Sequence, residues 1–466
     1  MTCRKRLSSA RHGQRRSAIL LDLAVCVLSF ALAACNDLLT ASNPDIVKTE
    51  DLTGPGALAA RRAGAFGDFV VAYGGNGARI ISNAVITNGQ VTASGLLSDE
   101  YKDAGQFPAL DGRRLTETNS DLTLFYAALH RAREAAEQTS EAYLDAGAVP
   151  GADVVIAEMM ILAGFSYTFF AESFCSGVPV SHVTKAGDVE YGQPLTTQEI
   201  LQRAGQRFDE ALARATTAAN AELQNVARVG KGRALLNLGQ FAQAATAVTA
   251  VPSNFRYLIR HSANTPRQGN AVFFGNNLTR HVTVADREGI NGIDYRGAFT
   301  AGDPRTPFVV NPAGSFDRIS GTQYDQQLYT SATAPIPLAT GIEARLIEAE
   351  AALQAGQLSQ FDAIHNQLRA TLNAAAVGPI SSAGMTMAER VDFHFRERAL
   401  WMWLTGHRLG DMRRLVRQYG RAVESVFPTG PYFKATYPTY GTQATLPIPD
   451  AETNNPNFTG CLDRNP

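Results

Sequence analysis

Apolar residues recur at helical spacing through most of the chain. The clearest stripe has intervals of three, four, three and one residue, which places its members on one face of a helix: Leu201, Ala204, Phe208, Ala211 and Leu212. Thr196, with Glu199 three residues later, forms a capping box that predicts the start of this helix. Further ranges of helical composition are 120–146, 153–174, 226–238, 240–250, 342–355, 360–372 and 387–418. Because strand-like alternation is rare, the pattern predicts a mostly helical protein.

Two segments share one helix–turn–helix pattern. Residues 234–241 and 351–358 each end one helix, turn at a Gly-Gln pair and start another. Gly239 and Gly356 fit the helix C-terminus, where a left-handed residue closes the turn without a side-chain clash. Such hairpins are typical of tetratricopeptide-like repeats, although two unrelated hairpins would give the same pattern. The predicted fold class is all-α, with tetratricopeptide-like helical hairpins, long irregular loop regions and little β-structure.

The helical pattern stops over residues 252–339, where Asn, Gly, Thr, Asp and aromatic residues take over. A long irregular stretch inside a compact protein is usually functional or disordered, and its aromatic residues argue against disorder. We therefore expect ligand-contacting loops here. They would belong to a single domain at 57–466, with a helical body at 57–251 and 340–420 and a C-terminal tail at 421–466.

Several aromatic residues fall in segments rich in Gly or Pro. Their flat apolar faces could stack on the C–H faces of sugar rings, beside the Asn, Gln and Asp side chains that hydroxyl groups need. The alternative for each ring is that it folds back onto the helical body. The candidate ligand-binding residues are Tyr73, Phe274, Tyr295, Tyr324, Tyr329 and Tyr432, and Tyr437 is a further loop aromatic.

The N-terminal segment is typical of an export signal. Six basic residues and no acidic residue lie in positions 1–16, and a short apolar stretch follows. The stretch ends in Leu-Ala-Ala-Cys35, which resembles the bacterial lipobox, where the Cys thiol is acylated and becomes the mature N-terminus. Asp22 interrupts the stretch, so a membrane anchor or a buried helix is the alternative. We expect a lipoprotein signal peptide at 1–34, lipidation at Cys35 and a polar tether at 35–56.

Composition and charge exclude some classes of protein and argue against nucleic-acid binding as the function. With 45% hydrophobic and 18% charged residues in 466, the chain is neither disordered nor collagen-like. Removal of residues 1–34 leaves 36 basic against 42 acidic residues, a net charge near −6 that disfavours nucleic-acid binding. In the oxidising compartment that export implies, Cys175 and Cys461 could pair as a disulfide or stay two buried thiols.

No catalytic or metal-binding motif stands out in the sequence. It contains no G-x-S-x-G, H-E-x-x-H, Walker A or C-x-x-C pattern. Residues 286–294 superficially suggest a calcium loop, but Ile290 stands where an oxygen ligand is needed. His365 and His407 lack a partner at ligand spacing, and we expect both to be structural. The prediction is a protein without enzymatic activity, cofactor or metal, although a hydrolase with carboxylates from distant positions would show no motif.

Three segments of the C-terminal third carry recognisable motifs in order: residues 344–353 contain Ala-Glu-Ala in a helical pattern, 395–414 contain Gly-x-Arg-x-x-Asp, and 446–457 contain Leu-Pro-Ile-Pro and Asn-Pro-Asn. Together they resemble motifs of the SusD/RagB family of outer-membrane nutrient-binding lipoproteins. Weaker likenesses lie at 157–179 and 303–305. In the second segment Thr405 stands where the family usually has Glu, and Arg408 and Asp411 could pair across one helical turn.

The resemblance implies a fold and a function. The fold would be the SusD-like α superhelix. The protein would be lipid-anchored at the cell outer membrane and surface-exposed, would bind an oligosaccharide or other oligomeric nutrient, and would deliver it to a SusC-like TonB-dependent transporter without catalysis or cofactor. The alternatives are a tetratricopeptide-like lipoprotein that scaffolds an envelope protein assembly and an exported hydrolase.

Overall fold

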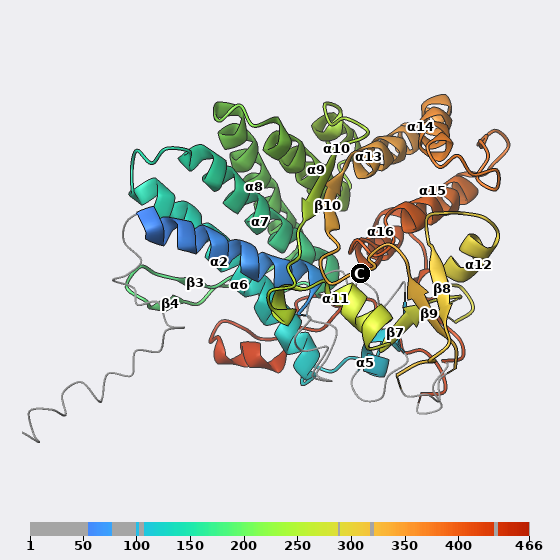
Figure 1. Cartoon of the computed structure of the whole chain (residues 1–466), viewed down its shortest axis with the longest axis horizontal. Coiled ribbons are helices and arrows are strands. Elements are labelled where there is room, and N and C mark those ends of the chain that lie inside the picture. The colour runs from blue at the N-terminus through green and yellow to red at the C-terminus, as the bar shows by residue number, and fades with distance from the viewer. Residues whose placement is uncertain are drawn as a thin grey trace, which may run out of the picture. The chain divides into compact units, whose positions relative to one another are not determined.

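The computed structural model describes residues 55–76, 99–101, 107–287, 289–316, 321–432 and 437–465. The predicted signal peptide at 1–34, the lipidation site Cys35 and the tether up to residue 54 lie outside the described residues. From Leu58 onward the chain forms one unit. In its described part helices dominate, and the strands are short (Figure 1).

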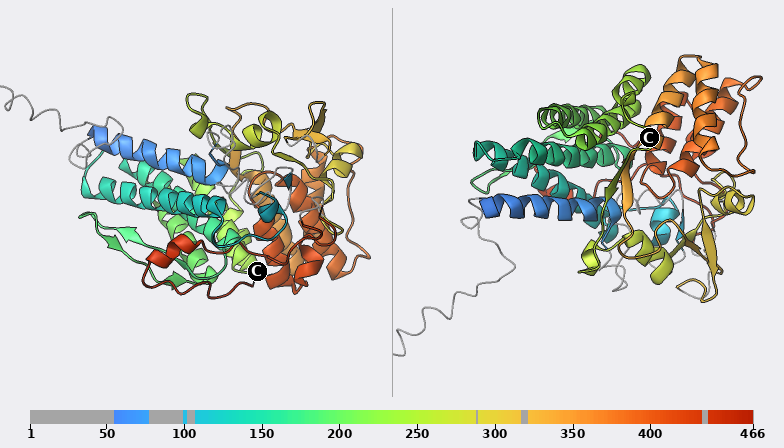
Figure 2. Two further views of the ribbon diagram at one scale, coloured as in Figure 1. Left: turned by 90° about the horizontal axis from the view of Figure 1, so that it is seen from below. Right: turned by 45° about the horizontal axis from the view of Figure 1, so that its top comes forward.

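Helices packed as successive hairpins form the helical body. They are α2 (Pro55–Gly74), α6 (Ser120–Asp145), α7 (Ala152–Ser173), α8 (Thr197–Thr217), α9 (Ala221–Asn237), α10 (Phe241–Val248), α13 (Gly341–Gln354) and α14 (Leu358–Ala370). Each of α6 to α9 packs against the helix that follows it, and α10 packs against α13 although residues 252–339 separate them in sequence (Figures 1 and 2). The array of helix pairs therefore continues across this insertion, as in tetratricopeptide-like repeats.

Local sequence features explain where these helices begin and end. The backbone N–H of Glu199 donates to Thr196 Oγ1 at 3.2 Å, and the backbone N–H of Thr196 donates to Glu199 Oε2 at 2.8 Å. The predicted capping box therefore starts α8. Gly239 and Gly356 have φ angles of 73° and 70° and close α9 and α13, as predicted.

The core of the helical body is α7. Among the described helices it alone is long and apolar enough to cross a membrane, but 89% of its apolar window is buried inside the protein, where it packs against α6, α8 and α9. A helix that is apolar on all sides is expected at such a central position. Gly164 of α7 and Gly230 of α9 both face the Phe208 ring of α8, and a Cβ at Gly230 would lie 2.2 Å from that ring. The two glycines therefore allow the three helices to pack closely.

The range of helical composition at 387–418 is divided into two helices in the structure. The segment forms α15 (Met387–Trp401) and α16 (Arg408–Tyr419), separated by a turn in which Leu404 has a φ of 56° and Gly406 a φ of 78°. Two tyrosines distant in sequence hold this turn. The hydroxyl of Tyr73 donates to Thr405 O at 3.1 Å, and that of Tyr329 donates to Leu404 O at 3.1 Å. The break is therefore stabilised by tertiary contacts.

The insertion is joined to the helical body by an antiparallel strand pair. Strands β6 (Arg256–Ile259) and β10 (Ile336–Thr340) bring its two ends together, with Ile259 opposite Ile336. Between them lie η3 (Pro266–Gln268), α11 (Ala271–Phe273), the π-helical turn η4 (Phe274–Leu278), β7 (Val282–Val284), α12 (Tyr295–Thr300), β8 (Phe308–Asn311) and β9 (Gln323–Gln326). Strands β8 and β9 pair antiparallel, with Phe308 opposite Gln326. The insertion thus has little regular structure, but its backbone is held by hydrogen bonds between paired strands.

The other described strands are equally short. β1 (Asp99–Tyr101) pairs with β7, β2 (Val178–Pro179) with β5 (Pro194–Leu195), and β3 (His182–Val183) with β4 (Val189–Glu190). The remaining elements are α5 (Phe107–Asp111), α17 (Val423–Val426) and η5 (Asp450–Asn454). Each described sheet has two strands, which agrees with the expectation of little β-structure.

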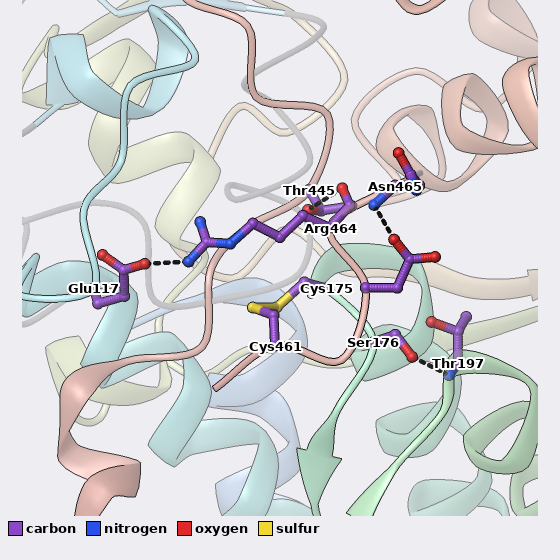
Figure 3. Close-up of a disulfide and its surroundings, with 9 residues drawn as sticks. Glu117, Cys175, Ser176, Thr197, Thr445, Cys461, Arg464 and Asn465 are labelled. Carbon is purple, nitrogen blue, oxygen red and sulfur yellow. Dashed lines mark hydrogen bonds and ion pairs between the residues drawn. A yellow bond between two sulfur atoms is a disulfide. The ribbon is translucent and has the colours of Figure 1, made fainter. Parts of the chain in front are cut away.

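A disulfide attaches the C-terminal tail to the end of α7. The Sγ atoms of Cys175 and Cys461 lie 2.00 Å apart (Figure 3), so the two cysteines left open by the sequence are bonded here. Backbone hydrogen bonds support the attachment: Leu462 N–H donates to Ser176 O at 2.8 Å, and Ser176 N–H donates to Asp463 O at 2.9 Å. Arg464 also pairs with Glu117. The tail is therefore an integral part of the helical body.

Candidate functional site

The charged residues of the second resemblance segment form a buried ion network. Asp411 Oδ1 accepts hydrogen bonds from Arg398 Nη2 at 2.9 Å and from Arg414 Nη2 at 2.8 Å. Arg414 also donates to both oxygens of Glu350, from the first segment. Burial acts to raise the pKa of Asp411, but the charges of Arg398 and Arg414 hold it well below its usual range. Asp411 thus pairs with these two arginines rather than with Arg408.

A second part of the network joins α7, α9, α13 and the turn at 402–407. Arg233 donates from Nε and Nη2 to the two oxygens of Glu172, at 2.8 and 2.6 Å. His407 Nε2 lies 3.0 Å from Glu343 Oε1, and its Nδ1 lies 2.9 Å from Thr405 Oγ1. Thr405, which departs from the family pattern, therefore helps to orient His407. All of these side chains are buried, so the network holds helices together and presents no acid–base pair to solvent.

His365 is equally internal. Its Nε2 lies 3.1 Å from Nδ1 of His394, and burial lowers the pKa of His365 to about 2. Within the described part of the chain, no group of three or more His, Cys, Asp or Glu side chains is placed to hold a metal ion.

Five of the six candidate ligand-binding aromatics are buried, which agrees with the alternative that such rings fold back onto the body of the protein. Tyr73 belongs to α2 rather than to a loop and is fully buried, and its hydroxyl also donates to Pro337 O at 2.5 Å. Tyr295 is 0% exposed and stacks on Trp403, with ring centroids 5.8 Å apart. The others are Phe274, Tyr329 and Tyr432. These rings have no free face in this structure because they anchor α2, the insertion and the tail to the core.

The sixth candidate, Tyr324, lies in a half-exposed aromatic cluster of the insertion. Its ring centroid is 5.3 Å from that of Phe308 at an interplanar angle of 86°, and Phe308 is 5.1 Å from Phe299. We call Phe299, Phe308 and Tyr324 the aromatic surface. The Arg296 guanidinium carbon lies 4.2 Å from the Tyr324 centroid, which is favourable cation–π geometry. All three rings are partly exposed, so the cluster can offer apolar faces to a ligand.

Polar and apolar neighbours extend the aromatic surface. Val309 and Val310 on β8 are 50% and 58% exposed. On the same hairpin, the Asn311 amide donates to Asp325 Oδ2 at 2.7 Å, and Arg296 pairs with Asp286 at 2.6 Å. Sequence reasoning missed Phe299, Phe308 and Arg296. The Phe-Val-Val run at 308–310, apolar within a polar stretch, was the available indication.

Tyr437, the further loop aromatic, is partly buried beneath an arginine. The guanidinium carbon of Arg114 lies 5.6 Å from its ring centroid, and the Tyr432 ring lies 6.3 Å away. Tyr437 therefore has its nearest ring neighbours in the tail and not in the insertion.

The helical body also carries a groove of about 820 Å³ between α8, α9 and α10. Apolar side chains line it, including Leu201, Leu212 and Leu235, together with glutamines such as Gln206 and Gln243. Lys231 of α9 and Asp209 of α8 also line it and pair with each other. A groove across successive repeat helices is a typical protein-binding surface.

Comparison with protein-family models and with curated protein sequences gives no match for this chain. Solved structures do match. A SusD-like carbohydrate binding protein from Bacteroides vulgatus superposes with a TM-score of 0.62 at 16% identity, over 86% of this chain and 97% of that one. A SusD superfamily protein from Bacteroides thetaiotaomicron gives a TM-score of 0.65 at 13% identity, over 87% and 99%. A SusD-like carbohydrate binding protein from Bacteroides fragilis gives 0.61 at 15%, over 88% and 99%.

These likenesses extend over nearly the whole length of each solved chain. The chain therefore has the SusD-like fold, and the predicted fold class is confirmed.

Proposed function

We propose that this protein binds an oligosaccharide at its aromatic surface and delivers it to a SusC-like TonB-dependent transporter. The observation that carries the proposal is the likeness, over almost the entire chain, to structures described as carbohydrate binding. The insertion supplies a surface suited to that task. The proposal includes no covalent chemistry, in keeping with the buried and paired carboxylates of the ion network.

Sugar binding at the aromatic surface follows from its composition. The C–H face of a pyranose needs a rigid apolar platform, and Phe308 and Tyr324 meet edge to face, so they present two differently oriented platforms. Arg296 holds Tyr324 from one side through its cation–π contact. On the same hairpin the partly exposed Asn311, held by the buried carboxylate of Asp325, is an amide of the kind that sugar hydroxyls bind.

A glycan array followed by calorimetry tests the binding. The mature protein would be screened, and the best ligand titrated against Phe308→Ala and, as a matched control, Tyr191→Ala, which removes an aromatic ring that is 48% exposed on another part of the molecule. Loss of one stacking ring costs about 0.5–1.5 kcal/mol beyond its buried area, so the dissociation constant of Phe308→Ala should rise about tenfold. Absence of any glycan ligand would contradict the proposal.

We further propose that acyl chains on Cys35 hold the protein at the outer membrane, facing outward. The lipobox-like sequence supports this, and two or more chains make such attachment durable because each buried CH₂ contributes about 0.8 kcal/mol. The test is a pull-down of the natively acylated protein from its own envelope, with Cys35→Ser as the unacylated control. Stoichiometric recovery of a TonB-dependent transporter is the expected result.

The groove between α8, α9 and α10 favours a second candidate, a scaffold for an envelope protein assembly. The same pull-down separates the two. Assembly proteins without a transporter, lost on Leu212→Glu at the groove, would support the scaffold and contradict nutrient delivery.

A further inference from the structure

A small pocket next to the aromatic surface contains three arginines. Its volume is about 130 Å³, and Arg305, Arg369 and Arg396 line it together with Asp303 and Glu397. We call it the arginine pocket. This volume is larger than the roughly 10–15 Å³ that a single water molecule needs. It is smaller than the roughly 300–1,000 Å³ of a site that binds a whole small molecule. It therefore suits a single functional group.

The two carboxylates of the pocket are fully engaged by two of its arginines. Arg305 donates to Asp303 Oδ2 at 2.6 Å and to Glu397 Oε2 at 2.8 Å. Arg369 donates from Nη1 to Glu397 Oε1 at 2.7 Å and from Nε to Gly378 O at 2.7 Å. Burial acts to raise the pKa of Asp303, but its bonds with Arg305 hold it below the ordinary value. Two positive and two negative charges thus compensate one another.

The third arginine of the pocket, Arg396, has no carboxylate partner among the described residues. Arg396 of α15 is exposed and makes no hydrogen bond or ion pair with any residue that the structure describes. The carboxylate one turn earlier on the same helix, Asp392, is paired with Arg421 at 2.7 Å. Arg369 also keeps its Nη2 group free of partners within the described chain. Among the residues that the structure describes, the pocket therefore has one uncompensated positive charge and guanidinium donors without an acceptor.

The arginine pocket and the aromatic surface share the helix α12. Ala298 and the C-cap residue Ala301 form part of the pocket wall. Phe299, between them in sequence, lies on the aromatic surface 5.1 Å from Phe308. The pocket and the rings therefore adjoin neighbouring positions of one helix, and the planar fork of a guanidinium group matches a carboxylate in bidentate geometry.

We propose that the oligosaccharide carries carboxylates, and that the arginine pocket binds one uronate carboxylate through Arg396 and Arg369 while a neighbouring sugar stacks on the aromatic surface. The inference rests on the proposed glycan-binding function and narrows it to acidic glycans. It also agrees with the size of the pocket, which admits a carboxylate and not a complete sugar.

The test uses uronate oligosaccharides, such as galacturonan and alginate fragments, and the same oligosaccharides after reduction of each carboxyl group to a primary alcohol. Calorimetry with the mature acylated protein in detergent should give a dissociation constant at least about tenfold lower for the acidic form. Arg396→Ala should weaken binding of the acidic form by roughly 10- to 100-fold and change the neutral form less than about twofold. Arg203→Ala, which removes an exposed arginine of α8, is the matched control.

The outcomes separate the two proposals. Equal binding of acidic and reduced oligosaccharides, or equal weakening of both by Arg396→Ala, would overturn the inference and leave glycan binding intact. Binding of acidic peptides with the same dependence on Arg396, without binding of uronates, would also overturn it. If no glycan of either kind binds, glycan binding itself fails.

Discussion

The ion pair between Glu172 and Arg233 gives the sharpest test of the buried network. Both side chains are almost fully buried, with 4% and 2% exposed. Arg233 also donates to Gly406 O at 3.0 Å and contacts His407, so the pair connects α7, α9 and the turn between α15 and α16. Replacement of Glu172 by Gln keeps the shape of the side chain and leaves the Arg233 charge without its carboxylate. The free energy of unfolding should therefore fall sharply.

The size of the fall can be worked from the structure. Removal of one partner of a buried ion pair costs about 3–5 kcal/mol, because the remaining charge stays desolvated. The unit from Leu58 to Pro466 has about 410 residues, so its unfolding entropy near the midpoint is about 0.86 kcal/mol per kelvin at about 2.1 cal/mol/K per residue. The expected fall in Tm for Glu172→Gln is then about 3–6 °C.

Thermal unfolding followed by circular dichroism measures this, with a double-mutant cycle to isolate the pair. Glu172→Leu with Arg233→Met should lose clearly less stability than the sum of the two single changes, because neither charge is then left alone. Asp209→Asn is the control, since the Asp209 side chain is 61% exposed in its pair with Lys231 and exposed pairs contribute about 0–1 kcal/mol. A Glu172→Gln protein with unchanged Tm, or strict additivity in the cycle, would refute the reasoning.

Three further predictions concern stability. Reduction of the Cys175–Cys461 bond, which spans 286 residues, should lower stability by about 2–5 kcal/mol, and a Tm insensitive to dithiothreitol would contradict this. Burial lowers the pKa of His261 to about 4. Between about pH 6.5 and pH 4, protonation of His261 therefore favours the unfolded state, and the free energy of unfolding should fall by up to about 1.4 kcal/mol per pH unit as the pH is lowered. Urea titrations of His261→Gln should show a shallower fall. Gly230→Ala should cost about 1–3 kcal/mol in the same titrations, and Phe208→Leu should restore part of it if the ring contact is the cause.

The helical body was predictable because the residues that begin and end its helices lie close to those helix ends in the sequence. The capping box at Thr196 and the glycines at 239 and 356 act within a few residues of the helix ends they define. The break between α15 and α16 was only partly predictable in this way. Gly406, with a φ of 78°, is a local signal of the same kind. Residues 401–404, however, are apolar and include no proline, and the turn is held by the hydroxyls of Tyr73 and Tyr329, which are 332 and 75 residues away from the carbonyls they bind.

The aromatic surface was predictable as a region but not as residues. Composition indicated the insertion as a place where aromatic and amide side chains gather. It could not tell which rings face inward, because Tyr295 and Tyr324 both lie in polar, Gly-containing segments and their burial depends on what packs on them. Trp403 covers the first, whereas Arg296 and Phe308 leave the second partly open.

The disulfide also sets an order of events in biosynthesis. Cys175 and Cys461 are 286 residues apart, and chains are made at about 5–20 residues per second, so Cys175 waits about 15–60 s for its partner. During that time the end of α7 carries a free thiol while α8 to α16 are still being made. The bond can form only after all of the chain between the two cysteines, including the insertion and the later helices, has been made.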